Sequence, residues 1–151
     1  MKNFKQKEAE PASKPKRLTK TVDDYMTKDL ITFMPDTPLQ DVVSSLLSNR
    51  ITGAPVLDDK GKIVGLIDDK DCLKLMFDSF YHNMPVSKKT TRDYMSNVMK
   101  SVKPGTEIME VANIFLTTPY KRLVVIDNNG ALKGQISRAD VLRAIQDEEW
   151  K

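Results

Sequence analysis

The sequence repeats itself, and this repeat limits the possible folds more than any other feature. A displacement of 69 positions aligns the segment from Asp24 to Leu73 with a later segment without a gap, and 14 of the 50 positions are identical. Unrelated segments of average composition would share roughly 6% of positions. The chain of 151 residues therefore predicts two small repeats that share a core.

Both repeats predict the order β-α-β-β-α, so the expected fold class is α+β. In each repeat a short extended segment precedes a helix, and two strands then flank a polar turn whose glycine supplies a positive φ. A second helix follows the hairpin, and residues 77–91 form a helix end and a connector. The expected strands are Leu30–Met34, Ala54–Leu57, Ile63–Ile67, Met99–Lys103, Leu123–Ile126 and Leu132–Ile136, and the expected second helices are Asp69–Phe77 and Arg138–Gln146.

The first helix of each repeat begins with a capping signal. In the first repeat Thr37 is the expected N-cap, followed by Pro38 at the first helical position and Gln40 as the partner in a capping box. In the second repeat Thr106 is the expected cap, and Glu107 suits the positive end of the helix dipole. We therefore expect both helices to start at these threonines.

The first helix of the second repeat is apolar on almost all sides, with Ile108, Met109, Val111 and Phe115 among its residues. One apolar stripe is enough to cover a sheet, so a helix that is apolar all round needs a second cover. That cover is expected to be either the other repeat or a second chain.

The positive charge of the chain belongs to its first residues. Residues 1–20 carry a net charge of +5, whereas the remainder carries −2, within a total of +3. This segment has two prolines and few large apolar residues, so we expect a disordered basic tail over residues 1–20. Binding of nucleic acid or an anionic membrane through the tail is a minor alternative, and we expect no specific nucleic-acid partner and no membrane association.

Several classes of protein are excluded by composition. The single cysteine, Cys72, and the single histidine, His82, exclude a disulfide framework and a zinc site. The sequence has no P-loop, no nucleophile elbow and no Gly-x-Gly-x-x-Gly motif, so we expect no enzyme and no bound metal. Without an apolar stretch near 18 residues or a signal-like segment, the expected location is cytoplasmic.

The residues suited to ligand chemistry lie where the hairpin of each repeat meets its second helix. Ser137 and Asp140 form a capping box there, as do Asp68 and Asp71 in the first repeat. A helix N-terminus also attracts anions, and a carboxylate such as Asp140 can accept two hydrogen bonds from a ribose. Gly134 would let a ligand approach the backbone closely. A phosphate beside a ribose indicates a nucleotide.

The duplicated pattern resembles the cystathionine-β-synthase (CBS) domain, which occurs in pairs as the Bateman module. The resemblance covers about residues 21–147, with one repeat over residues 21–81 and the other over 89–147. The residues that carry it are Met26-Thr27, Leu30-Ile31-Thr32, Ala54-Pro55-Val56-Leu57-Asp58, Gly61, and the Gly-x-x-Ser-x-x-Asp run at Gly134, Ser137 and Asp140.

The resemblance implies a module that binds an adenosine-containing ligand (AMP, ADP, ATP, S-adenosylmethionine, NAD or a cyclic dinucleotide) and regulates another protein. It also implies a homodimer formed through the helices. Carried over to this sequence, Asp140 would hold the ribose and Ser137 the phosphate, with Arg138 beside it. The base would lie against the first repeat, on Ile31, Thr32, Ile51, Thr52 and Ala54.

A second cleft, at Asp68 and Asp71, is the weaker candidate. The resemblance implies that it is lined by Ser101, Val102, Tyr120, Lys121 and Arg122. Asp68 stands where the family has Ser or Thr, and a carboxylate 4 Å from a phosphate costs roughly 1–4 kcal/mol. Lys121 and Arg122, or a Mg²⁺ ion between Asp68 and a polyphosphate, would offset this repulsion. Val124 and Met99-Lys100-Ser101 also depart from the family pattern.

Two functions are therefore expected from the sequence. The first is a free-standing regulatory CBS pair that senses an adenosine-containing ligand and signals to a separate protein partner. The alternative is a ligand-free dimerisation or interaction module with degenerate clefts, in which the basic tail would dock an acidic partner.

Overall fold

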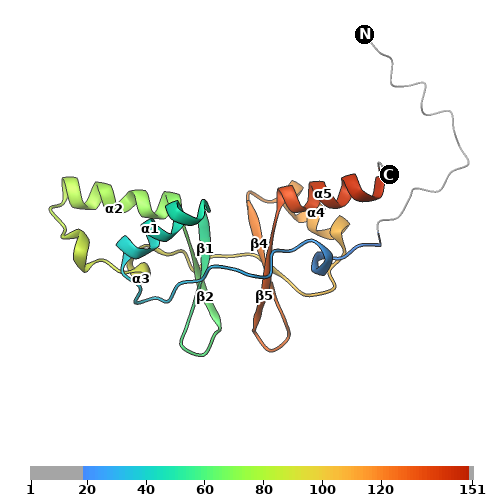
Figure 1. Cartoon of the computed structure of the whole chain (residues 1–151), viewed down its shortest axis with the longest axis horizontal. Coiled ribbons are helices and arrows are strands. Elements are labelled where there is room, and N and C mark those ends of the chain that lie inside the picture. Colours follow the sequence, from blue (N-terminus) through green and yellow to red (C-terminus); the bar gives the residue numbers. More distant parts are fainter. Residues whose placement is uncertain (1–18, 150–151) are drawn as a thin grey trace, which may run out of the picture.

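The computed structural model describes residues 19–149, and its mixture of helices and strands confirms the α+β class. Of the basic tail predicted for residues 1–20, only Thr19 and Lys20 lie among the described residues. Two halves stand side by side, each a hairpin with helices at one end (Figure 1). The elements are η2 (Val22–Asp24), α1 (Leu39–Asn49), β1 (Gly53–Leu57), β2 (Ile63–Asp68), α2 (Asp69–Tyr81), η3 (Val86–Lys88), α3 (Thr91–Tyr94), β3 (Ser101–Val102), α4 (Ile108–Thr117), β4 (Arg122–Ile126), β5 (Leu132–Ser137) and α5 (Arg138–Glu149).

The two hairpins form as the sequence predicts. β1 pairs antiparallel with β2, from Gly53 opposite Asp68, and β4 pairs with β5, from Arg122 opposite Ser137. The turn glycines Gly61 and Gly130 have φ angles of 81° and 83°, the positive values that these turns need. Each hairpin thus delivers the end of its second strand directly to the start of the following helix.

The expected strand Leu30–Met34 is not formed, whereas its counterpart in the second repeat is present as the short strand β3. Phe33 makes only an isolated parallel bridge, in which its N–H donates to the carbonyl of Pro55 at 3.0 Å. Val124 of β4 occupies the position that matches Pro55, and its N–H donates to the carbonyl of Lys100 at 3.3 Å. Proline has no N–H to donate, so the first repeat lacks the hydrogen bond that extends the pairing into a strand.

The prediction of a capping box at the start of the first helix is wrong. Helix α1 begins at Leu39, and Pro38 stands at its N-cap without a side-chain hydrogen bond. Thr37 instead accepts a hydrogen bond from the backbone of Met34 at 3.0 Å. The first helical N–H, of Leu39, donates to the carbonyl of Lys89 at 3.0 Å. A backbone partner at the start of the second repeat therefore replaces the side-chain cap.

Helix α4 differs from its expectation in the same way. Its N-cap is Glu107 rather than Thr106, and the Thr106 hydroxyl donates to the carbonyl of Lys103 at 2.6 Å. The N–H of Ile108 donates to the carbonyl of Lys20 at 3.1 Å. The second helices, α2 and α5, each run a few residues beyond the ends predicted for them.

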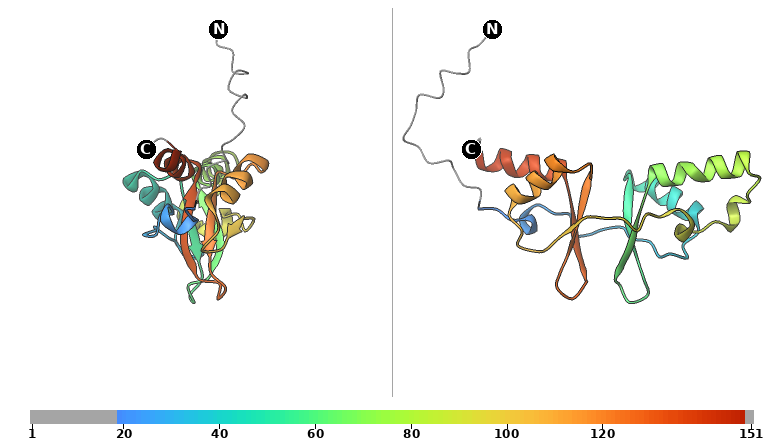
Figure 2. Two further views of the ribbon diagram at one scale, coloured as in Figure 1. Left: turned by 90° about the vertical axis from the view of Figure 1, so that its right-hand side faces the viewer. Right: turned by 180° about the vertical axis from the view of Figure 1, so that it is seen from behind.

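Each hydrophobic core combines segments from both repeats. The segment around Val22–Met26 crosses to the second half, and the segment around Tyr94–Met95 packs on the first, and both crossings are visible from the front and from behind (Figures 1 and 2). One core contains Val22, Val102, Ile108, Val111, Phe115, Leu123, Val125, Ile136, Val141 and Ala144, and the other contains Phe33, Leu39, Val42, Leu46, Ala54, Val56, Ile67, Leu75 and Tyr94.

A matched pair of tyrosines ties these crossing segments down. The Tyr25 hydroxyl donates to Asp147 of α5 at 2.6 Å, and the Tyr94 hydroxyl donates to Asp78 of α2. Burial, and then the Asp78 carboxylate, raise the pKa of Tyr94 to about 12. The bridge between Lys62 and Ala131, which occupy the same position in the two repeats, lies where the halves meet. The two halves are therefore related by an approximate twofold axis.

The second face of helix α4 is not covered by the other repeat. Ile108, Val111 and Phe115 are buried, but Met109 is 54% exposed and Leu116 is 84% exposed. The other repeat, one of the two covers expected for this helix, therefore leaves this face open. Among residues 19–149 no helix is both long and apolar enough to cross a membrane.

Candidate functional site

The start of helix α5 holds the capping box predicted there. The N–H and hydroxyl of Ser137 donate to Asp140 Oδ2 at 2.8 and 3.1 Å, and the N–H of Asp140 donates to Ser137 Oγ at 3.4 Å. Asp140 Oδ1 is paired with Arg143 on the next turn, and the Asp140 side chain is only 5% exposed. The carboxylate is therefore fully engaged, and a ribose would have to replace Arg143 at Oδ1.

The start of helix α2 has the same backbone geometry with a different charge. The N–H of Asp71 donates to Asp68 Oδ1 at 2.8 Å, and the N–H of Asp68 donates to Asp71 Oδ2 at 3.1 Å. Burial, and then the neighbouring Asp68 carboxylate, raise the pKa of Asp71 above its ordinary value, and the hydrogen bond from the Asp68 backbone opposes this. Lys74 lies 3.9 Å from Asp71, whose side chain is 16% exposed.

The single cysteine is a packing residue. Cys72 is half-buried on α2 against the core of the first half. Burial, and then Asp71, raise the pKa of its thiol to about 11, so the thiol remains protonated at neutral pH. His82 is exposed at the C-cap of α2. Among residues 19–147, whose side chains the structure describes, no group of three or more His, Cys, Asp or Glu side chains is placed to hold a metal ion.

A cavity of about 190 Å³ lies between the two repeats, close to the start of α5. It contains two of the side chains predicted to hold a base, Ile31 and Ile51, and a residue from the other repeat, Gln135 of β5. Ala54 is buried in the core and Thr32 is exposed, and neither is part of the cavity wall. The remaining wall residues are Thr27, Asp29, Leu30, Gly53 and Pro55.

The close approach predicted at Gly134 is made by the chain itself. A Cβ atom at this position would lie 2.7 Å from Met26 Sδ and 2.8 Å from the carbonyl oxygen of Thr27. The matching Gly65 meets the carbonyl oxygen of Ser96 at 2.8 Å. Both glycines therefore let the crossing segments pass over the hairpins.

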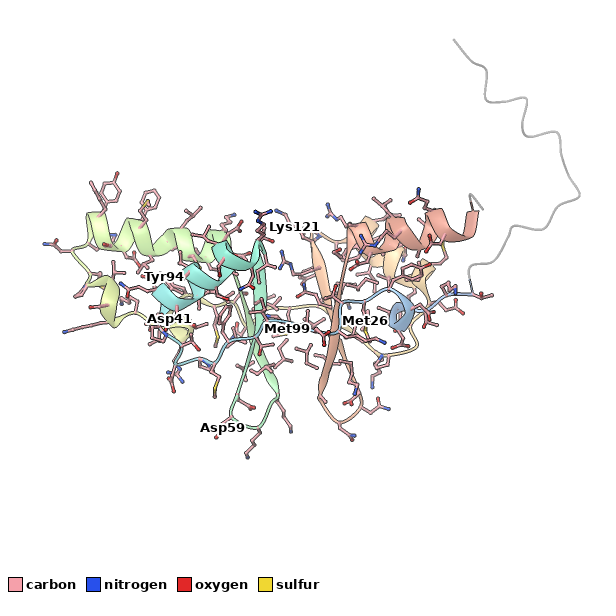
Figure 3. All side chains as sticks on the ribbon, in the orientation of Figure 1. Met26, Asp41, Asp59, Tyr94, Met99 and Lys121 are labelled. Atoms are coloured by element: carbon pink, nitrogen blue, oxygen red, sulfur yellow. The ribbon has the colours of Figure 1, made fainter. Side chains whose placement is uncertain are left out.

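The residues assigned to the second cleft are only partly brought together. Arg122 reaches the first repeat and donates to Thr52 Oγ1 at 2.6 Å, so it touches a residue assigned to the first cleft. Lys121 is exposed at the helix-bearing end, between the two halves (Figure 3). Val102 is a core residue, and Ser101 is exposed beside it in β3.

Arg138 is the other arginine beside a helix start. Its guanidinium donates to the carbonyl of Tyr120 at 3.4 Å and is otherwise exposed. It lies in the first turn of α5, one residue after Ser137. It is therefore placed beside the helix N-terminus at which a phosphate was predicted.

Two residues of this region were missed by sequence reasoning. Arg143 stands three residues after Asp140 with the opposite charge, a helical spacing that pairs side chains. Gln135 is a polar residue at a strand position where the first repeat has the apolar Leu66. Both signals were present in the sequence, the first as a charge pattern and the second as a mismatch between the repeats.

The chain matches a family model, that of the CBS domain, twice, over residues 22–78 and 92–147. Among curated proteins, it is 34% identical to the CBS domain-containing protein CBSX1, chloroplastic, of Arabidopsis thaliana, over 88% of this chain and 67% of that protein. It is also 32% identical to the uncharacterized protein MJ1225 of Methanocaldococcus jannaschii, over 81% of this chain and 46% of that protein.

Solved structures agree with this family match. The structure of CBSX2 in complex with AMP superposes with a TM-score of 0.73 at 33% identity, covering 84% of this chain and 96% of that one. The structure of MJ1225, described as a putative archaeal homolog of the AMPK γ subunit, superposes with a TM-score of 0.74 at 29% identity, covering 83% of this chain and 47% of that one.

Proposed function

Because the chain belongs to the CBS domain family, with two copies of the domain in tandem, we propose that it is a free-standing regulatory module. It binds an adenosine-containing ligand of the AMP, ADP or ATP class between its two repeats and signals its occupancy to a separate protein. It performs no catalysis of its own.

The observation that carries this proposal is the cavity between the repeats. It joins Ile31 and Ile51 of the first repeat to Gln135 of the second, and Ser137 follows Gln135 by two residues on the same strand. An apolar cavity beside a helix N-terminus suits a ligand with a flat base at one end and an anion at the other.

Each side chain at the start of α5 has a distinct part in this proposal. The Ser137 hydroxyl and the N–H groups of the first turn donate hydrogen bonds to the phosphate. The exposed guanidinium of Arg138 adds a positive charge. Asp140 accepts the ribose hydroxyls after Arg143, whose side chain is 59% exposed, swings out to solvent. The relative CBSX2, solved in complex with AMP, supports the ligand class.

Calorimetry with AMP, ADP, ATP, S-adenosylmethionine and NAD tests the proposal. The Asp140→Asn variant keeps the size of the side chain and one acceptor, and we expect it to weaken binding by about tenfold or more. Asp71→Asn is the matched control in the other cleft, and we expect it to leave this binding unchanged. Absence of binding to all five ligands, or full binding by Asp140→Asn, would contradict the proposed site.

The cleft at Asp68 is proposed to take up anionic nucleotides poorly. Asp68 places a second carboxylate where Ser137 places a hydroxyl, and Arg122 is already engaged with Thr52. If Mg²⁺ bridges Asp68 and a polyphosphate, ATP binding to this cleft will require Mg²⁺ while binding to the Asp140 cleft will not.

A homodimer is also proposed, formed through the helix-bearing end. Leu47 and Leu116 occupy matching positions of α1 and α4 and are 74% and 84% exposed, and Leu73 and Leu142 of α2 and α5 are 59% and 65% exposed. Leu47 and Leu73 line an apolar groove of about 930 Å³ between α1 and α2. A patch repeated about an approximate twofold is self-complementary, which suits a second copy of the chain. Sedimentation of wild type and Leu116→Glu tests it, because the variant should be monomeric.

The alternative of a ligand-free interaction module also has an observation in its favour, the near-complete coverage of Asp140 by Ser137 and Arg143. In this alternative the chain would bind none of the five ligands and would still dimerise. Loss of binding to an acidic protein partner after deletion of residues 1–20 would support it. The calorimetric experiment therefore separates the two functions.

A further inference from the structure

Gln135 presents a buried hydrogen-bond acceptor that the folded chain leaves unused. Its side-chain oxygen, Oε1, is enclosed and has no hydrogen-bond partner, and no other buried side-chain nitrogen or oxygen among the described side chains of residues 19–147 is in this condition. Buried polar atoms are almost always paired, because an acceptor without a donor destabilises the fold. Gln135 also lines the cavity between the repeats, so a rotation of its carboxamide would present this acceptor to a ligand bound there.

The fold does not need an amide at this position. The backbone of Gln135 exchanges two hydrogen bonds with Thr27, at 3.0 and 2.8 Å. Leu66, at the matching position of the first repeat, exchanges the same two bonds with Ser96, at 2.8 Å each. Leucine therefore fulfils the structural role, and the polar group is an addition specific to the second repeat.

The wall around this amide is largely apolar. Leu30, Ile31, Ile51 and Pro55 line the same cavity of about 190 Å³. A cavity of about 150 Å³ with such a lining is large enough for benzene, so a flat heterocycle fits here. One polar group in an apolar slot fixes the orientation of the ring that enters it. The other polar wall residues, Thr27 and Asp29, are exposed.

We propose that Gln135 is the residue that selects the base of the ligand, with its Oε1 accepting a hydrogen from the exocyclic amino group of adenine. A carboxamide matches adenine well, since it can accept from the 6-amino group while donating to a ring nitrogen. This inference rests on the proposed function, because it assigns the base-reading contact of the same cleft. In this proposal the exocyclic amino group of adenine is the source of base selectivity.

A double-mutant cycle between protein and ligand tests the contact. The protein change is Gln135→Leu, which copies the first repeat, and the ligand change is from AMP to purine riboside 5′-monophosphate, which lacks the amino group. We expect wild type to bind AMP about tenfold more tightly than the analogue, as one hydrogen bond to a buried neutral acceptor predicts. The Gln135→Leu variant should lose this preference and bind both ligands with similar affinity, because leucine pairs with neither the amino group nor the ring nitrogen.

Two controls keep the outcomes distinct. Leu66→Gln, the reverse change in the other repeat, should leave the AMP-to-analogue ratio unchanged. Without ligand, Gln135→Leu should have an equal or higher melting temperature than wild type, because it removes an unpaired acceptor. A lower melting temperature with an unchanged ratio would assign Gln135 a purely structural role.

The failures of the two proposals have different signatures. If wild type binds AMP and Gln135→Leu retains the tenfold preference for AMP, the base-reading role is wrong while the proposed function stands. If wild type binds neither nucleotide, the proposed function fails and this inference fails with it.

Discussion

The two helix starts, Asp68–Asp71 and Ser137–Asp140, share one backbone design and differ in charge. Both form reciprocal caps at the end of a hairpin, although the N–H of Asp71 lies 2.8 Å from its acceptor and the N–H of Asp140 lies 3.4 Å from its own. One presents two carboxylates, of which Asp71 has a raised pKa, whereas the other presents a hydroxyl and a carboxylate paired with Arg143. The comparison teaches that the fold fixes where a ligand can meet a helix N-terminus, while single side chains decide which ligand is accepted.

The clefts also differ in what crosses between the repeats. Arg122 extends from the second half to Thr52 and occupies the space beside Gly53, where a Cβ would lie 2.7 Å from its Nη1. The residue that matches Arg122 in the first half is Gly53 itself, so no arginine crosses in the opposite direction. The Arg122 guanidinium therefore lies beside Gly53 and Thr52, near the Asp68 end of β2.

The largest expected effect is a loss of stability at Gly65 and Gly134, the matching glycines over which the crossing segments pass. Gly65→Ala and Gly134→Ala each place a Cβ within 2.8 Å of a backbone oxygen, so each should destabilise the protein by about 2–3 kcal/mol. Urea unfolding of both variants measures this loss. If Gly134→Ala loses ligand affinity but no stability, the two glycines are not equivalent. The close neighbour of Gly134 would then be a ligand and not the crossing segment.

Exchanging the capping residues should interchange the behaviour of the clefts. Ser137→Asp keeps the helix cap but brings a carboxylate to the phosphate position, so AMP affinity should fall by about tenfold or more. Asp68→Ser should allow a second AMP to bind. Calorimetric stoichiometry reports both changes, and retention of one site in Asp68→Ser would show that Asp68 is not what closes that cleft.

The matched tyrosines should differ in their contribution to stability. Tyr94→Phe removes a hydroxyl that is buried against Asp78, and we expect a loss of about 1 kcal/mol. Tyr25→Phe removes an exposed bond to Asp147, and we expect about half of that loss. Thermal unfolding of the two variants tests the difference. Equal losses would mean that the different exposure of the two hydroxyls does not change their contribution to stability.

The smallest effect is the pH dependence of the Asp68 and Asp71 pair. Burial, and then Asp68, raise the pKa of Asp71, so ionised Asp71 lowers stability at neutral pH, and protonating it removes this penalty. Asp68→Ser should therefore stabilise the protein by a few tenths of a kcal/mol at neutral pH, a value kept small by solvent screening. The advantage should vanish once Asp71 is protonated. Urea midpoints across this pH range test it, and a constant difference would contradict the coupling.

Sequence reasoning predicted the elements that depend on local signals. The hairpins followed from the turn glycines, and the caps at the second helices followed from Ser137 and Asp68. It failed where a backbone group finds a partner far along the chain. The N–H groups of Leu39 and Ile108 bond to Lys89 and Lys20, so the threonine caps were not used.

The candidate site shows the same division. The pairing of Ile31 with Ile51 in one cavity was predicted through the family resemblance, whereas the entry of Gln135 into that cavity was not. The ligand roles given to Ser137, Arg138 and Asp140 stay predictions. Arg143 could have been found from its helical spacing to Asp140, whereas the mismatch at Gln135 becomes informative only when its neighbours across the fold are known.

The sequence by itself determined the duplication, the α+β class and the reciprocal caps, because these depend on spacing within a repeat. Only the tertiary structure decided that the Tyr25 and Tyr94 segments exchange halves, that Gly134 accommodates Met26, and that Arg122 reaches Thr52. Contacts between residues far apart in the sequence depend on how the two halves pack, and no local pattern of residues records that packing.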